Sequence, residues 1–117
     1  MDYINIMTYD NAGMWEKKTG HHSGFDWAKA GMAFWATHIT KSKLLLGVPF
    51  YGVSFTLQNA AQHGIGAPVT ASSAITYTEI CNSVKKSGWK KESTPQGPIA
   101  YKDTHWVGYD DPNAIAQ

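Results

Sequence analysis

The stretch INIMTYD, residues 4–10, begins as an apolar strand and ends on a phenol beside a carboxylate. Alternation puts one set of side chains on each side of such a strand, namely Ile4, Ile6 and Thr8 against Asn5, Met7 and Tyr9. Because neither side is consistently polar, the stretch is typical of a strand covered on both faces, as in a parallel sheet with helices outside. Enzymes built on such sheets place their chemistry at the C-terminal ends of the strands, which makes Tyr9 and Asp10 candidate site residues. A strand that ends in a local turn capped by Asp10 is the alternative interpretation.

The composition is that of one small domain with a core and no strong electrostatic preference. The chain has 117 residues and a formal net charge of +1, which gives no reason to expect nucleic acid or an anionic membrane as a partner. Five Trp and six Tyr are many for this length, and exposed rings beside polar groups suit the apolar faces of sugars. Aromatic side chains also fill cores, and for Trp27 and Trp35, which lie on a helical pattern, we expect a place in the core.

The cysteine and histidine residues form no recognisable metal or nucleophile motif. Cys81 is the single cysteine, so it is either a buried thiol or half of a bridge whose partner lies outside the chain. His21 and His22 are adjacent, which rarely lets two side chains converge on one metal, and no zinc-site spacing accompanies them. We expect a structural or solvent-exposed role for this pair, a surface position for His63 and His105, and no metal or cofactor. No apolar run reaches membrane-spanning length, and no signal-peptide pattern is present.

The first 52 residues have the pattern of a βαβ unit. Residues 25–36 carry apolar side chains at helical spacing. The run KLLLGVPFYG, residues 43–52, is typical of a second buried strand that enters a loop marked by Pro and Gly. With a long polar loop over residues 11–24, the order strand, helix, strand predicts parallel pairing of the two strands.

The remainder of the chain has the character of a small α+β unit. Its expected elements are a strand at residues 53–57, a loop at 64–68, a capping box at Thr76–Glu79 that opens a helix to about Lys86, a hairpin of residues 98–101 and 105–109, and a helix beginning at Asp111–Pro112. That last helix is cut off at Gln117, so we expect the chain to be part of a longer protein.

Segments in this order resemble the family-18 glycoside hydrolases, which comprise chitinases and inactive chitinase-like lectins. The segments are MTYD at 7–10, Trp15-Glu16, Thr19-Gly20-His21, KLLLGVPFYG at 43–52, Ser54–Leu57, Gly66–Pro68, Tyr77 with Glu79–Cys81, and WVGYDDP at 106–112. The resemblance implies an α/β fold, a partial (β/α)8 TIM barrel with an inserted small α+β chitinase insertion domain. Residues 1–52 would form strand six, helix six and strand seven, residues 53–111 the insertion domain, and residues 112–117 the start of the next barrel helix.

The resemblance also implies roles for residues around the end of the first strand. Tyr9 matches the tyrosine that hydrogen-bonds the N-acetyl carbonyl oxygen of the substrate, and Asp10 matches the aspartate that holds the distorted sugar ring. These two are the expected catalytic residues. Such enzymes are exceptions to the two-carboxylate rule, because the N-acetyl oxygen attacks the anomeric carbon while a glutamate protonates the leaving oxygen. Met7, Trp15 and Tyr51 match residues that line the substrate cleft.

The chain differs from the family pattern in two respects, and one further match concerns its single cysteine. The family signature D-x-x-D-x-D-x-E is absent from the chain, so the general acid is not expected here. Val53 stands where the family usually has an arginine, and because Val offers no hydrogen-bond donor, a contact to a sugar hydroxyl is expected to be lost. Cys81 matches a cysteine whose disulfide partner lies outside the chain.

The function implied by the resemblance is that of part of a secreted, extracellular chitinase. The parent protein would hydrolyse β-1,4-linked N-acetylglucosamine polymers by substrate-assisted catalysis with retention. This chain would supply substrate-binding residues without the general acid and be inactive by itself. The alternatives are a catalytically inactive chitin-binding lectin of the same fold and an antigen fragment without activity. The expected partners are chitin or chitooligosaccharides, with no nucleic acid and no membrane.

Overall fold

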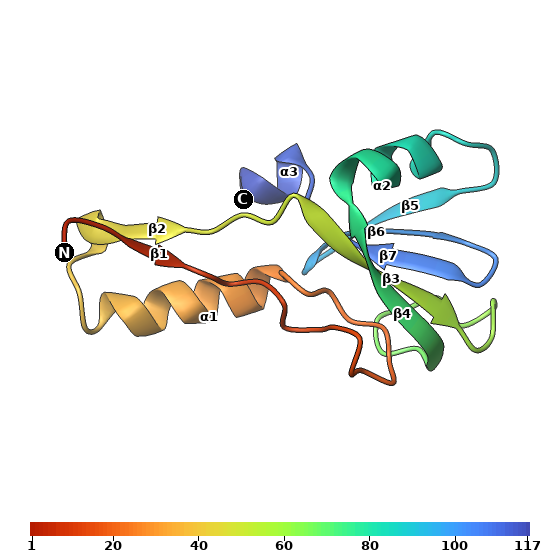
Figure 1. Ribbon diagram of the computed structural model, residues 1–117, viewed down its shortest axis with the longest axis horizontal. Coiled ribbons are helices and arrows are strands. Elements are labelled where there is room, and N and C mark those ends of the chain that lie inside the picture. The colour runs from red at the N-terminus through yellow and green to blue at the C-terminus, as the bar shows by residue number, and fades with distance from the viewer.

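Two β-sheets, one parallel and one antiparallel, lie towards opposite ends of the protein (Figure 1). The computed structural model describes residues 1–117 and measures 46 × 27 × 21 Å along its principal axes. The two-stranded parallel sheet consists of β1 (Ile4–Ile6) and β2 (Leu44–Leu46). Helix α1 (Phe25–Ala36) and the short 3-10 helix η1 (Lys41–Lys43) connect them, so the predicted βαβ unit is confirmed.

Helix α1 has the predicted bounds, but the expected core position of its tryptophans is wrong. Trp27 is 46% exposed and Trp35 is 38% exposed, and no residue of α1 is buried. At the middle of the helix, Gly31 faces Thr8: a Cβ on Gly31 would lie 2.7 Å from the Thr8 methyl carbon. The reason for the exposure is that the sheet beside α1 has only two strands of three residues each. It does not extend far enough to cover the rings on either side of Gly31.

The antiparallel sheet has five strands in the order β4-β3-β7-β6-β5. Its strands are β3 (Tyr51–Leu57), β4 (Val69–Thr76), β5 (Lys90–Thr94), β6 (Gly97–Lys102) and β7 (His105–Gly108). The pairing of β6 with β7 is the predicted hairpin. The outer strands β4 and β5 were not predicted. Their sequences, VTASSAIT and KKEST, are largely polar and exposed, so they lack the apolar alternation that marks a strand with a buried face.

Apolar side chains cover both faces of this sheet. On one face Ile80 from helix α2 (Tyr77–Val84) packs with Ala100, Val107 and Tyr109. The opposite face holds a second cluster of Ala12, Val53, Phe55, Leu57, Ala67, Ile99 and Trp106, in which Ala12 and Ala67 come from loops. Val53 is 5% exposed and belongs to this second cluster. Val53, for which the resemblance implied an arginine, is therefore a core residue in this chain.

Helix starts follow local sequence signals. Thr76 accepts a hydrogen bond from the Glu79 N–H, and the Glu79 carboxylate accepts one from the Thr76 N–H, so the predicted capping box is confirmed. The helix ends at Val84, two residues before the predicted end at Lys86. The last helix, α3 (Pro112–Ile115), begins at the predicted cap, where the Asp111 carboxylate accepts the Ala114 N–H. No helix of the protein is both long enough and apolar enough to cross a lipid bilayer.

Removing the cap of α2 should destabilise the protein, because Ile80 on this helix forms the centre of one core cluster. We expect Thr76→Ala to lower the free energy of unfolding by about 1 kcal/mol. Urea denaturation measures this change, and Thr78→Ala is the matched control, since Thr78 is exposed and makes no capping bond. Equal losses in the two variants would contradict the capping role.

A buried histidine fastens the loop of residues 11–24 to the antiparallel sheet. His21 is 6% exposed, and its Nε2 lies 2.7 Å from the carbonyl oxygen of Tyr109. Its Nδ1 accepts the Ser23 N–H at 3.3 Å. A Cβ on Gly97, which has φ of +134°, would lie 2.8 Å from Nε2. Glycine at this turn therefore both adopts the left-handed backbone and leaves room for the imidazole.

The next residue, His22, joins the end of β1 to the start of β3. It is fully buried, its Nδ1 accepts the Asp10 N–H at 3.3 Å, and its Nε2 lies 3.2 Å from the Tyr51 carbonyl oxygen. A ring nitrogen that accepts an N–H is unprotonated, so in both histidines Nε2 carries the proton and donates it to a carbonyl. Burial lowers the pKa of both imidazoles and keeps them neutral.

The two neutral histidines predict a loss of stability in mild acid. Below about pH 6.5, the ordinary histidine value, the unfolded chain binds protons to both imidazoles while the folded chain does not. Each histidine then lowers the free energy of unfolding by at most about 1.4 kcal/mol per pH unit, until the pH reaches its lowered folded-state pKa. Urea denaturation at about pH 7 and about pH 5.5 measures this loss, and the variant His21→Asn/His22→Asn should show a flatter pH dependence. A wild-type protein that is equally stable at both pH values would contradict the neutral buried pair.

Candidate functional site

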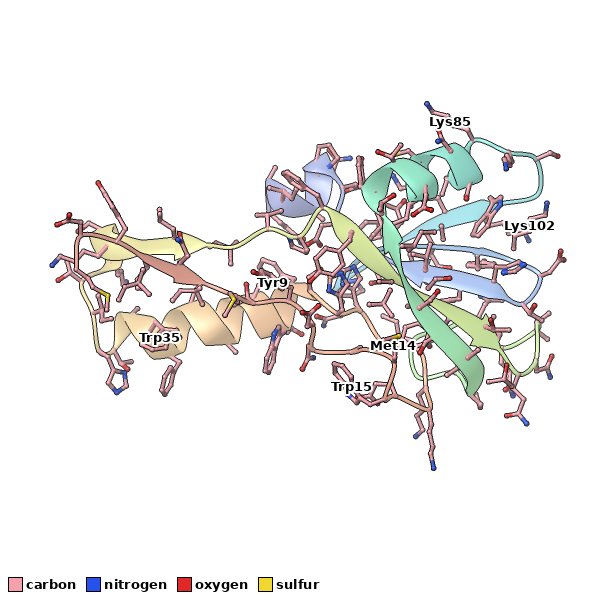
Figure 2. The ribbon with its side chains drawn as sticks, in the orientation of Figure 1. Tyr9, Met14, Trp15, Trp35, Lys85 and Lys102 are labelled. Atoms are coloured by element: carbon pink, nitrogen blue, oxygen red, sulfur yellow. The ribbon has the colours of Figure 1, made fainter.

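Tyr9 and Asp10 follow β1, and Tyr9 lies between the two sheets (Figure 2). The Gly47 N–H donates to the Ile6 carbonyl oxygen at 2.8 Å, which continues the parallel pairing past the end of β2. A Cβ on Gly47 would lie 2.9 Å from Tyr9 Cε1 and 2.8 Å from the Ile6 carbonyl oxygen. Glycine at this position therefore lets the chain after β2 pass close to the Tyr9 ring, which is half-buried.

Asp10 adopts an unusual backbone conformation that aims its carboxylate at Tyr51. Its φ is +61°, in the left-handed region that aspartate tolerates better than most residues. The Tyr51 hydroxyl donates to Asp10 Oδ1 at 2.6 Å, across 41 positions of the chain. The Asp10 side chain is 59% exposed. The carboxylate is thus held by a phenol on one side and open to solvent on the other.

Tyr51 contacts Asp10, Tyr9 and His22. Its ring stacks on His22 with centroids 4.9 Å apart, and it meets the Tyr9 ring edge-on at 6.3 Å. Burial, with the hydrogen bond to Asp10 as the next cause, raises the pKa of the Tyr51 phenol. The phenol therefore remains a protonated donor at neutral pH. We call Tyr9, Asp10 and Tyr51 the tyrosine–aspartate cluster.

The structure does not bring the other predicted residues into this cluster. Met7 is 73% exposed and Trp15 is 67% exposed. Trp15 lies on the loop after β1, apart from Tyr9 (Figure 2). Its indole N–H donates to Glu16 at 3.1 Å, and its ring lies over Gly13, where a Cβ would come within 2.3 Å of a ring carbon. Both side chains are open to solvent in this chain, and their substrate-binding roles stay predictions.

Cys81 lies on α2, remote in sequence and fold from the cluster. It is a partly exposed free thiol, and its proximity raises the pKa of the Tyr77 phenol. No group of three or more His, Cys, Asp or Glu side chains converges anywhere in the structure. The disulfide expected for Cys81 stays a prediction.

His22 is the residue of the site that sequence reasoning missed. Its place in an adjacent pair suggested a structural or solvent-exposed role, and its full burial excludes exposure. Its two neighbours in the site lie 12 and 29 positions away along the chain. No helix or strand periodicity brings residues at these separations together, so the contacts could not be predicted from sequence spacing.

A separate cavity of about 330 Å³ lies on the other side of β1. Thr8, which alternates with Tyr9 along the chain, lines it together with parts of α1, the end of β2 and α3. The Thr8 hydroxyl is buried without a hydrogen-bond partner. None of the cluster residues borders this cavity, so it is distinct from the tyrosine–aspartate cluster.

Comparison with known proteins places the chain in a family. The model of the glycosyl hydrolases family 18 matches residues 1–117. Probable chitinase 10 of Drosophila melanogaster is 36% identical over 97% of this chain and 6% of the relative, and the endochitinase of Manduca sexta is 36% identical over 98% of this chain and 26% of the relative. A class V chitinase mutant from Cycas revoluta, solved in complex with (GlcNAc)3, has a TM-score of 0.91 and 35% identity over 99% of this chain and 36% of that one.

The chain therefore spans a minor part of each of these relatives, at most 36% of the length of any of the three. The match nevertheless extends over its whole length, from the parallel strands to the last helix. Both curated relatives bear the names of chitinases. This protein chain belongs to family 18 of the glycosyl hydrolases.

Proposed function

We propose that this chain forms one side of the substrate cleft of a chitinase that hydrolyses β-1,4-linked N-acetylglucosamine polymers. In this proposal residues 1–52 are strand six, helix six and strand seven of a (β/α)8 barrel. Residues 53–111 are the α+β chitinase insertion domain, and residues 112–117 begin the next barrel helix. The parallel pairing of β1 with β2 and the antiparallel sheet that follows support this division.

The observation that carries the proposal is the tyrosine–aspartate cluster at the C-terminal end of β1. Active sites of barrel enzymes lie at this end of the strands. A carboxylate held by a phenol at 2.6 Å, with its remaining surface open, is ready to meet a sugar hydroxyl or an acetamide N–H. The half-buried Tyr9 phenol beside it can donate to an acetamide carbonyl.

These groups suit substrate-assisted hydrolysis with retention. The acetamido oxygen of the substrate attacks its own anomeric carbon, and the bond to the leaving sugar breaks as a general acid protonates the glycosidic oxygen. Tyr9 favours this attack by orienting the acetamide, and Asp10 holds the distorted sugar ring. The family's signature glutamate is absent from the chain, so the proton must come from a residue elsewhere in the parent protein.

Two further features belong to the same proposal. We propose that the parent protein is secreted and that Cys81 forms a disulfide with a cysteine outside this chain. The partly exposed position of Cys81 on α2 supports such a bridge, because its sulfur is accessible to another segment. In an oxidising compartment a bridge that closes a long loop contributes about 2–4 kcal/mol. Chitin or chitooligosaccharides are the proposed partners.

The proposal predicts which kinetic constant depends on Tyr9. In a parent protein that carries the catalytic glutamate, Tyr9→Phe should lower kcat by about 10²-fold and change KM less, because the lost donor acts on the transition state. Initial rates with chitooligosaccharides measure both constants, and Tyr3→Phe is the matched control at an exposed tyrosine. An unchanged kcat with a raised KM would make Tyr9 a ground-state binding residue only. Turnover by the 117-residue chain alone would contradict the placement of the general acid outside it.

A further inference from the structure

We infer that His22 is a positioning residue, which fixes the Asp10 carboxylate against the Tyr51 phenol. This inference deepens the proposed function and rests on it for its consequences in catalysis. Three contacts carry it: the Asp10 N–H donates to Nδ1, Nε2–H donates to the Tyr51 carbonyl oxygen, and the imidazole stacks on the Tyr51 ring. One rigid, fully buried ring thus contacts both partners of the 2.6 Å hydrogen bond in the cluster.

The geometry at Asp10 shows why such a support is needed. The left-handed φ of +61° is costly for a residue with a side chain and persists only where the surroundings hold it. The N–H bond to Nδ1 holds the backbone in this conformation, and the bond from Tyr51 holds the side chain. Without the first bond the backbone is free to leave the left-handed region, and the carboxylate would turn away from Tyr51.

The Tyr51 end is supported in the same way. Its carbonyl accepts the Nε2–H at the very start of β3, and its ring rests on the imidazole. His22 therefore sets the distance between the end of one sheet and the start of the other. Its ring is fully buried and its two hydrogen bonds are partly buried, which limits the competition of water for the same backbone groups.

The support requires a neutral imidazole. Burial lowers the pKa of His22, and the neighbouring His21 lowers it further. The hydrogen bond to the Tyr51 carbonyl and the negative charges of Asp110 and Asp10 raise it in part. The Tyr51 phenol also faces the ring, but it is uncharged at neutral pH. A proton on Nδ1 would remove the acceptor for the Asp10 N–H and point towards Asp10 Oδ1, which lies 3.8 Å away. Protonation of His22 thus replaces the hydrogen bond from the Asp10 N–H by an ion pair with the Asp10 carboxylate.

The adjacent histidine provides a matched control. His21 is also buried, accepts a backbone N–H at Nδ1 and donates to a carbonyl from Nε2. Its hydrogen-bond partners are Ser23 and Tyr109, and although its ring stacks on His22 with centroids 6.2 Å apart, it makes no hydrogen bond to Asp10 or Tyr51. The substitution His21→Asn therefore makes the same chemical change one position away without touching the cluster.

The first experiment uses the 117-residue chain and amide hydrogen exchange followed by NMR. His22→Phe keeps an aromatic ring and removes both hydrogen bonds, and we expect it to speed exchange of the Asp10 amide by about tenfold or more. His22→Asn retains an acceptor near the place of Nδ1 and should restore most of the protection, and His21→Asn should leave it unchanged. Long-range proton–nitrogen spectra should show the Nε2–H form of His22 at neutral pH.

Protected amides of β3 and β7 report whether each variant is folded. If His22→Phe does not fold, His22→Gln takes its place, because its longer amide reaches towards Tyr51 and leaves the Asp10 N–H without an acceptor. His22→Gln should then expose the Asp10 amide and His22→Asn should protect it. Unchanged exchange in the variant that removes the acceptor, or an Nδ1–H form of His22, would overturn the inference.

The kinetic consequence is tested in a parent protein that carries the catalytic glutamate. His22→Phe, or His22→Gln, should lower kcat by about 10- to 100-fold with a smaller change in KM, whereas His21→Asn should leave both nearly unchanged. Equal loss of kcat in the His21 and His22 variants would overturn the positioning role. The proposed function and the role of His22 are tested by different measurements. If calorimetry detects no binding of (GlcNAc)3 to the chain, that result counts against the proposed function. The exchange rate of the Asp10 amide decides the role of His22 whether or not the sugar binds.

Discussion

The hydrogen bonds of two neutral imidazoles connect the two sheets of this chain, which share no strand. His21 binds the end of β7 through Tyr109, and His22 joins Asp10 after β1 to Tyr51 at the start of β3. The parallel sheet has strands of only three residues and the helix beside it has no buried residue. The polar junction, rather than an extended apolar core, thus sets where the two parts meet.

The local features of the fold could be predicted from sequence because neighbouring residues determine them. The capping box at Thr76, the hairpin around Asp103 and the bounds of α1 each depend on spacing within one element. The polar edge strands β4 and β5 could not, because pairing with β3 and β6 determines their conformation. The tryptophans of α1 show the opposite error: a helical pattern identifies an apolar stripe but not whether anything lies over it.

In the candidate site, too, residues marked by local sequence could be predicted, whereas a residue placed by tertiary contacts could not. Tyr9 and Asp10 were predicted from their position after an apolar strand and from a family motif, and Tyr51 from the family resemblance. The structure adds the 2.6 Å hydrogen bond that joins Tyr51 to Asp10. His22 was not recognised, because its contacts depend on the path by which residues 11–24 return to the end of β1. Val53 shows how tertiary context changes the meaning of a substitution. It belongs to the same buried cluster as Phe55 and Ile99, at a position where the sequence resemblance led us to expect an arginine in contact with the substrate.

We propose that the tyrosine–aspartate cluster binds the N-acetylated sugar, with Tyr9 at its acetamido group and Asp10 at its ring. The most direct measurement is a set of intermolecular nuclear Overhauser effects between (GlcNAc)3 and the isotopically labelled chain. We predict contacts from an N-acetyl methyl group to the ring protons of Tyr9 and Tyr51, with the largest chemical-shift change of any aspartate at Asp10. Contacts confined to the exposed rings of Trp27 and Trp35, with no change at Asp10, would contradict the account.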